Sequence, residues 1–253
     1  MDLIDTHCHL TERPLCESLA AVLDRAARAG VTRIVVPAYD PPSWPLVQAL
    51  AAANPGTIYP ALGLHPWVAD QRLDLGDLAN RLRDCRAVAI GEVGLDTRIE
   101  SPDLLVQIPA LEQQLELARD LGLPVILHCR GAFAELADVL ERFSPRLQGV
   151  LHAFSRSPEL ARRFLRLGLH LGIGGSVTRP RARNTRATAN TLPLERLLLE
   201  TDAPSIGLEG IPPEAVEPRH VRDVAETVAH LRGVEPDRIA DATTRNAAQL
   251  FGL

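Results

Sequence analysis

The sequence predicts a single-domain (β/α)₈ TIM barrel that spans residues 1–253. Eight apolar, β-rich runs alternate with helix-like stretches along the chain, and strict alternation of this kind favours a parallel sheet surrounded by helices. The length of 253 residues fits the roughly 250 residues that are typical of such a barrel. No Gly-rich phosphate loop follows an early strand, which disfavours the alternative, a doubly wound open sheet.

The predicted strands are short runs rich in Val, Ile and Leu. In chain order they cover residues 3–10, 32–38, 58–65, 87–95, 124–129, 149–154, 170–175 and 196–202. Between and after them, helices are predicted at 17–30, 110–122, 132–143, 215–233 and 243–252. Several of these stretches end in Gly directly before a strand, which is a common signal for the end of a helix.

Composition limits the classes of function. The net charge is −5, so the overall balance does not by itself indicate a nucleic-acid-binding protein. All 27 basic residues are Arg, which excludes Lys as a Schiff-base nucleophile or general base. The cysteines, Cys8, Cys16, Cys85 and Cys129, contain no C-x-x-C pair, which is typical of a reducing compartment. With no signal peptide or membrane-spanning run, a cytoplasmic protein without membrane or obligate protein partners is predicted.

Metal-ligand residue types recur at the ends of the predicted strands, where barrel enzymes carry their chemistry. They are His7, His9, His65, Glu92, His128, His152 and Asp202. Burying an imidazole or carboxylate without a partner costs several kcal/mol. A bound cation would supply that partner, and the recurrence therefore predicts a metal centre.

The opening segment "DLIDTHCHL" places His7 and His9 on one face of a strand and Cys8 on the other. Two such imidazoles can hold one divalent ion, and the alternative is a pair of hydrogen-bonded core histidines. Glu92 has two oxygens and can bridge two cations, with Gly91 and Gly94 expected to leave room beside it.

On this interpretation, His128 and His152 hold a second ion, and Asp202 completes the first. Two ions about 3.5–4 Å apart can activate a shared water. The alternative for Glu92 or Asp202 taken alone is a helix cap or an ion pair.

Several motifs, read in order over residues 4–252, resemble the signature blocks of the TatD family of metal-dependent deoxyribonucleases. They are "DTHCHL", "GLHPW", "GEVGLD", "LHCR", "LHAFS", "GIGGSVT", "LLLETDAP" and "TTRNAAQLF". The resemblance implies a barrel with two, sometimes three, divalent ions that hydrolyses phosphodiester bonds in DNA. Mg²⁺ or Mn²⁺ is expected in function, with Zn²⁺ as an alternative.

The resemblance also implies a role for each of the matching residues. One ion is held by His7, His9 and Asp202, the other by His128 and His152, and Glu92 bridges them. His65 matches the family's histidine near the scissile phosphate. The chain departs from the family pattern at Ala153, Arg156, Val216 and Thr97, where the family usually has Cys, Gly, Asn and Tyr.

The expected mechanism uses Asp202 as proton acceptor, with Glu92 and His65 as the other catalytic residues. His65 and Arg130 are expected to contact the phosphate, although a surface ion pair is an alternative role for Arg130. Trp67 is a candidate for base stacking. The expected substrate is DNA, cleaved exonucleolytically at single-stranded ends.

Other interpretations stay open at this point. The basic stretch at 178–186 either follows a DNA backbone or is a solvated surface. The same metal site can serve a phosphomonoester, a cyclic amide or a lactone instead of DNA. The alternative from another class is a metal-binding barrel without catalysis.

Overall fold

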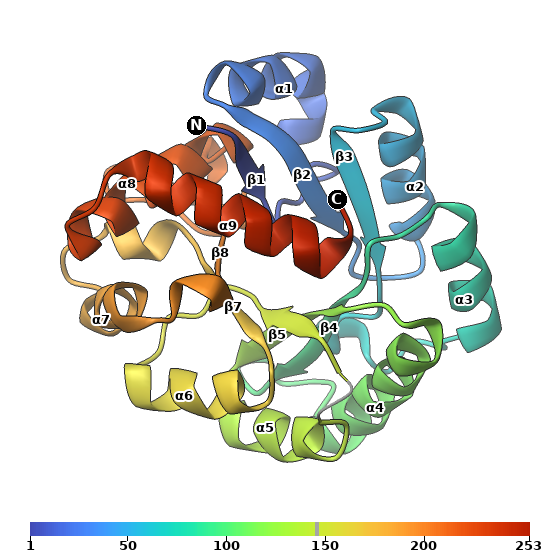
Figure 1. Cartoon of the computed structure of the whole chain (residues 1–253). Coiled ribbons are helices and arrows are strands. Elements are labelled where there is room, and N and C mark those ends of the chain that lie inside the picture. Colours follow the sequence, from blue (N-terminus) through green and yellow to red (C-terminus); the bar gives the residue numbers. More distant parts are fainter. Residues whose placement is uncertain (145–146) are drawn as a thin grey trace.

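The computed structural model describes residues 1–144 and 147–253, in which eight parallel strands alternate with helices around a barrel (Figure 1). Each strand pairs with its neighbours in chain order, from β1 to β8. The strands are β1 Leu3–Asp5, β2 Val31–Pro37, β3 Ile58–Leu62, β4 Ala89–Asp96, β5 Val125–Arg130, β6 Gly149–Leu151, β7 His170–Ile173 and β8 Leu197–Leu199. The predicted fold class is confirmed.

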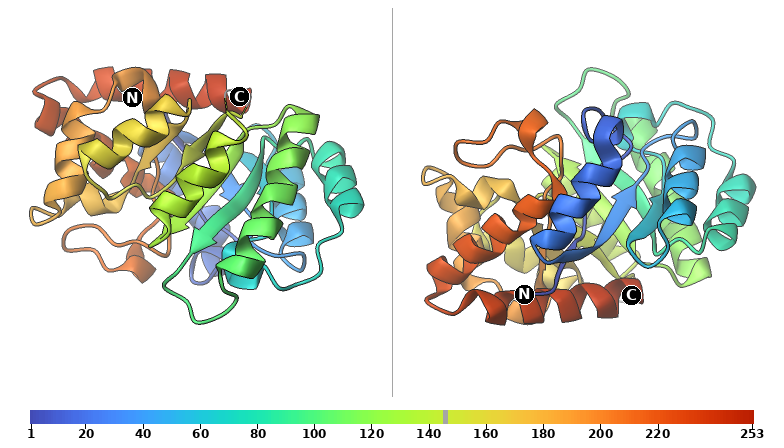
Figure 2. Two further views of the ribbon diagram at one scale, coloured as in Figure 1. Left: turned by 90° about the horizontal axis from the view of Figure 1, so that it is seen from below. Right: turned by 90° about the horizontal axis from the view of Figure 1, so that it is seen from above.

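The helices form an outer ring, and a final helix crosses one end of the barrel (Figure 2). They are α1 Leu19–Arg28, α2 Trp44–Ala53, α3 Leu75–Asp84, α4 Leu104–Leu121, α5 Phe133–Glu141, α6 Pro158–Arg166, α7 Arg183–Thr191, α8 Val221–Arg232 and α9 Pro236–Phe251. Across the described ranges, no helix is long and apolar enough to cross a membrane.

Local sequence signals explain where helices begin and end. The Asp103 side chain accepts hydrogen bonds from the N–H groups of Leu105 and Val106, which caps α4. Gly122 ends the same helix in the left-handed conformation, with φ of 66°. The predicted helix over 110–122 therefore begins too late, because α4 starts six residues earlier and continues through Pro109.

The barrel closes through the segments that follow β1 and β8 rather than through a regular ladder. Cys8 forms an isolated parallel bridge with Ala203. The N–H of Asp202 donates to the carbonyl of His7, and the N–H of His9 donates to the carbonyl of Ala203, both at 2.8 Å. The seam of the barrel therefore carries three of the predicted metal ligands.

This seam corrects the predicted lengths of the first and last strands. Regular strand structure ends at Asp5 and at Leu199, although strands were predicted over 3–10 and 196–202. The residues beyond these points pair with each other across the seam, with irregular backbone geometry. Asp202 itself has φ of 52°, a left-handed conformation that is uncommon for a residue other than Gly.

The hydrophobic core has two parts. The larger part lies between the strands and the helical ring, and it includes Trp44, Phe154 and Phe164. The smaller part fills the barrel near the start of the strands and is covered by the end of α9. Its buried members are Ile4, Val35, Ala61, Ala89, Ile126, Val150, Leu198, Ala247, Leu250 and Phe251.

Candidate metal centre

The seven predicted ligand-type residues lie together at the carboxyl end of the strands. The segments after β1, β3, β6 and β8 carry His7 and His9, His65, His152 and Asp202, while β4 and β5 carry Glu92 and His128. All except His7 line one cleft of about 820 Å³. His7 is fully buried.

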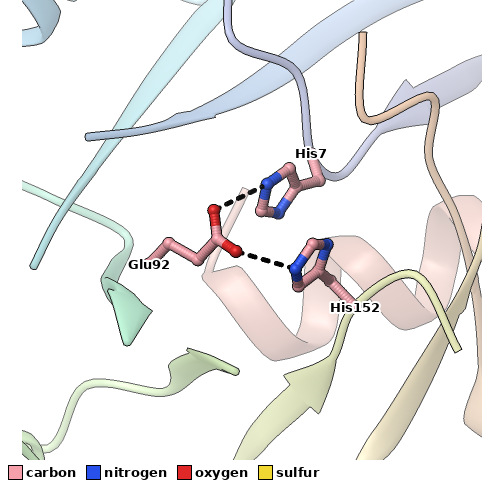
Figure 3. Close-up of side chains that lie close together, drawn as sticks. All are labelled: His7, Glu92 and His152. Carbon is pink, nitrogen blue, oxygen red and sulfur yellow. Dashed lines mark ion pairs between the residues drawn. The ribbon is translucent and has the colours of Figure 1, made fainter. Parts of the chain in front are cut away.

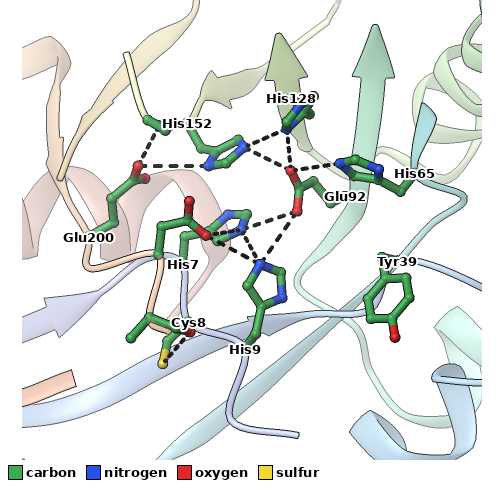
Figure 4. Close-up of polar contacts among 12 residues, drawn as sticks. His7, Cys8, His9, Tyr39, His65, Glu92, His128, His152 and Glu200 are labelled. Atoms are coloured by element: carbon green, nitrogen blue, oxygen red, sulfur yellow. Dashed lines mark hydrogen bonds and ion pairs between the residues drawn. The ribbon is translucent and has the colours of Figure 1, made fainter. Parts of the chain in front are cut away.

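Glu92 is the centre of the cluster, and its two carboxylate oxygens face different histidines (Figure 3). Oε2 lies 3.2 Å from His7 Nε2, whereas Oε1 lies 2.8 Å from His152 Nε2. Oε1 is also 2.9 Å from His128 Nδ1 and 3.4 Å from His65 Nε2 (Figure 4). One buried carboxylate therefore connects two groups of imidazoles.

The second corner of the cluster contains His7, His9 and Asp202. His7 Nε2 lies 3.2 Å from His9 Nε2, so the two rings direct nitrogens at one point. Asp202 Oδ1 lies 3.3 Å from His9 Nε2 and 3.7 Å from His7 Nε2. The alternation expected of the opening segment therefore puts both imidazoles on one side, even though regular strand structure ends before them.

The donor geometry fits divalent cations. Three groups of side chains bring their ligand atoms within 4.8 Å of one another: His7, His9 and Asp202; His7, Glu92 and His152; and His65, Glu92 and His128. Ligands about 2.1 Å from a metal in tetrahedral or octahedral geometry lie roughly 3.0–3.4 Å apart. The contacts in this cluster run from 2.8 to 3.7 Å, which brackets that spacing.

The electrostatics favour a ligating form at Glu92 and His7, whereas at His152 burial is outweighed by the charge of Glu92, which raises the pKa of His152 to about 10, so a cation would have to displace that proton. Burial opposes ionisation of Glu92, yet the charges of His152, His65 and His7 hold its pKa well below the usual value. Burial, together with the nearby His152, lowers the pKa of His7 to about 4, so this imidazole is neutral at pH 7. Ionised carboxylates and neutral imidazoles are the forms that ligate metals.

The glycines around Glu92 have a different purpose from the one predicted. A Cβ atom on Gly94 would lie 2.0 Å from the carbonyl oxygen of His128, and one on Gly91 would lie 2.6 Å from Cβ of Ile126. Both glycines therefore allow β5 to approach β4 closely, instead of leaving space for the carboxylate. That close approach places His128 beside Glu92.

Asp96 supports the site and was absent from the sequence-based prediction. Its Oδ2 accepts hydrogen bonds from Trp67 Nε1 at 2.8 Å and from His128 Nε2 at 3.3 Å. Burial opposes its ionisation, but these hydrogen bonds hold the pKa of Asp96 below its usual value. With Nε2 of His128 donating to Asp96, the lone pair of Nδ1 would be available to a cation held between His128 and Glu92.

Two further buried carboxylates were also missed. Glu200 accepts the Ala153 N–H and lies 3.8 Å from His152 Nδ1 (Figure 4), while burial raises its pKa to about 8. Asp5 accepts hydrogen bonds from Thr201, through its N–H at 2.9 Å and its hydroxyl at 2.6 Å. Each lies two residues before a predicted ligand, so strand alternation was a signal that would have found them.

The predicted substrate residues lie around the same cleft. His65 is buried, Trp67 is 53% exposed, and the exposed Arg130 lines the wall near His128. No residue of the basic stretch over 178–186 lines this cleft. Within it, Arg186 donates to the carbonyl of Val177 just before the stretch, and Arg179 donates to the carbonyl of Gly207 in the segment after β8.

The chain matches the family described as "TatD related DNase" over residues 4–252. It is 41% identical to the uncharacterized metal-dependent hydrolase YjjV of Escherichia coli K12, over 99% of this chain and 98% of YjjV. The crystal structure of YjjV matches with a TM-score of 0.93, again over 99% and 98% of the two chains. The 3'-5' ssDNA/RNA exonuclease TatD of Erwinia billingiae is 34% identical, over 99% of each chain.

These matches extend along nearly the whole length of the chain and include the segments that carry the clustered donors. The same barrel, with the same order of strands, therefore accounts for both the likeness and the cluster. The protein belongs to the TatD family of metal-dependent hydrolases.

Proposed function

We propose that this protein hydrolyses phosphodiester bonds of DNA at single-stranded ends and depends on two divalent cations. The observation that carries this proposal is Glu92, whose two oxygens face two separate groups of donors. A carboxylate shared in this way suits a pair of ions, which is an arrangement used for in-line displacement at phosphorus. The relative from Erwinia billingiae, a 3'-5' ssDNA/RNA exonuclease, supports nucleic acid as the substrate class.

In this proposal, His7, His9 and Asp202 would hold one cation, and His128 and His152 would hold the other. Glu92 would contact both. Mg²⁺ or Mn²⁺ suits the function, and Zn²⁺ suits the imidazole-rich donor set. Divalent cations held there supply positive charge that lowers the pKa of water and stabilises charge on phosphate oxygens.

Asp202 is the proposed proton acceptor. Burial would raise its pKa, but the hydrogen bond with His9 and the charge of His7 hold that pKa below its usual value. The carboxylate is therefore ionised at neutral pH and can take the proton of the attacking water. Asp202 is buried and lines the cleft.

His65 and Arg130 are proposed to contact the phosphate. His65 Nδ1 accepts the N–H of Trp67 at 3.2 Å, which directs Nε2 toward Glu92 and the reacting centre. Arg130 lines the same cleft, and its planar guanidinium matches the geometry of phosphate oxygens. The Trp67 indole offers an exposed face for stacking of one base.

We place this activity in the cytoplasm, because all four cysteines are free thiols, which suits a reducing compartment.

Product analysis on end-labelled oligonucleotides tests the proposal. Single- and double-stranded substrates are incubated with Mg²⁺, Mn²⁺ or Zn²⁺, beside a phosphomonoester, a cyclic amide and a lactone. We expect stepwise release of nucleotides from single-stranded ends, and loss of this activity in Glu92→Ala. Turnover of the monoester, amide or lactone without cleavage of DNA would contradict the proposal, as would a Glu92→Ala variant with full activity.

A further inference from the structure

The wall of the cleft next to β5 and β6 carries two arginines that form no ion pair within the described part of the chain. Arg130 and Arg156 both line this wall, and both are exposed. Neither forms an ion pair with any residue in the two described ranges. By contrast, Arg13, another cation that lines the cleft, pairs with Glu17 at 3.2 Å.

Two contacts position Arg156, and neither is with an acidic group. Its guanidinium carbon lies 4.9 Å from the centre of the Phe133 ring, at the start of α5. Its main-chain carbonyl accepts the Thr188 hydroxyl of α7 at 2.7 Å. Contact with an aromatic face limits the movement of a guanidinium and leaves its N–H groups free for an anion.

The two arginines lie farther along their segments than the metal-type donors do. Arg130 comes two residues after His128, and Arg156 comes four residues after His152. Phe133, which supports Arg156, is only three residues beyond Arg130. Both arginines therefore line the same cleft, on the two segments whose histidines contact Oε1 of Glu92.

We propose that Arg156 forms a second phosphate subsite, which binds the phosphate next to the scissile one that Arg130 is proposed to contact. This inference rests on the proposed function and names its substrate class: chains with at least two phosphates, in preference to esters with a single phosphate. Guanidinium groups bind phosphate with paired hydrogen bonds, and such contacts strengthen as salt is lowered. Arg156 is therefore proposed as a specificity-determining residue.

Kinetics on two substrates test the subsite in Arg156→Ala. For a single-stranded oligonucleotide, we expect kcat/KM to fall by about 10-fold or more, mainly through KM, as for loss of one charged hydrogen bond. The slope of log affinity against log salt concentration should become shallower by the amount expected for the loss of about one phosphate contact. For bis(p-nitrophenyl) phosphate, which has one phosphate, the change should stay below about two-fold.

Arg181→Ala is the matched control, because Arg181 is exposed and lies outside the cleft. This variant should leave kcat/KM unchanged for both substrates. Arg156→Lys, which keeps the charge but not the planar fork, should restore part of the loss. Equal losses on both substrates, or an equal effect of Arg181→Ala, would overturn the subsite.

Equilibrium binding of the same fluorescently labelled oligonucleotide separates this inference from the proposed function. If the wild-type protein binds the oligonucleotide through Arg156 without cleaving it, the proposed nuclease activity is wrong and the subsite stands. If the wild-type protein cleaves the oligonucleotide and Arg156→Ala binds it equally well, the subsite is wrong and the nuclease stands. Absence of any binding by the wild-type protein overturns the subsite.

Discussion

The two ends of the barrel interior are built by the same strands from opposite kinds of side chain. Near the strand beginnings, Ile126 and Val150 pack with Phe251 of α9 in a buried apolar cluster. At the strand ends, His128 and His152 meet around Glu92. In each of these two segments, a single residue lies between the apolar contact and the metal-type donor.

The two ends therefore contribute differently to folding stability and to chemistry. The closed end is the end of the barrel that α9 covers. Burial of apolar side chains there contributes to the free energy of folding whether or not cations are bound. The open end is the end that carries the donor cluster and the cleft. Its carboxylates and imidazoles are removed from water, which costs free energy unless hydrogen bonds or cations compensate. We therefore expect substitutions at the closed end to change unfolding and substitutions at the open end to change metal binding and turnover.

The largest effect is expected from Asp202→Asn at the open end. Asn tolerates the left-handed backbone of this position and keeps one oxygen, but it accepts a proton poorly. Turnover should fall by about 10²–10⁴-fold, the usual contribution of acid–base catalysis, with a much smaller change in substrate affinity. Steady-state kinetics measured beside metal content tests this expectation.

His65→Ala separates phosphate contact from metal binding at the same end. This variant should keep its full metal content and lose stabilisation of the phosphate. Near-normal turnover in Asp202→Asn, or loss of an ion from His65→Ala, would show that the roles of these two residues are assigned wrongly.

Phe251→Ala tests the closed end. Phe251 is 5% exposed, and removing its ring from the cluster under α9 should lower the free energy of unfolding by about 3–5 kcal/mol. Denaturant unfolding with Mn²⁺ and with EDTA should show the same Mn²⁺-dependent stabilisation as in the wild-type protein. Glu92→Ala should show the reverse pattern, with that stabilisation lost. A loss of Mn²⁺-dependent stabilisation in Phe251→Ala would mean that the two ends are coupled.

Asp96→Ala, also at the open end, should have the smallest effect of these substitutions. Loss of the carboxylate that orients His128 should weaken metal affinity by about 10–100-fold, as measured by calorimetric titration with Mn²⁺ or Zn²⁺. Trp67→Phe is the control, because it removes the indole hydrogen bond to Asp96 and leaves the one from His128 in place. Unchanged metal affinity in Asp96→Ala would exclude this supporting role.

The sequence alone was sufficient for the fold class and for the residues that converge in the cluster. Strand segments show as short apolar runs, and the local backbone geometry makes alternate residues share a face. Histidines and carboxylates at the ends of such runs, from His7 to Asp202, are conspicuous because buried polar groups are costly. These signals are local, so they can be read without knowing which segments meet.

Only the tertiary structure decided which side chains support that cluster and how the barrel closes. Asp96 bonds to Trp67 and His128, which come from two other strands or their loops, and this contact depends on the register between strands. The seam between Cys8 and Ala203 joins segments 195 residues apart in the chain. Arg156 meets Phe133 in the same way, through the packing of neighbouring βα units. Contacts of this kind arise from the packing of distant segments, so the local pattern of residues does not predict them.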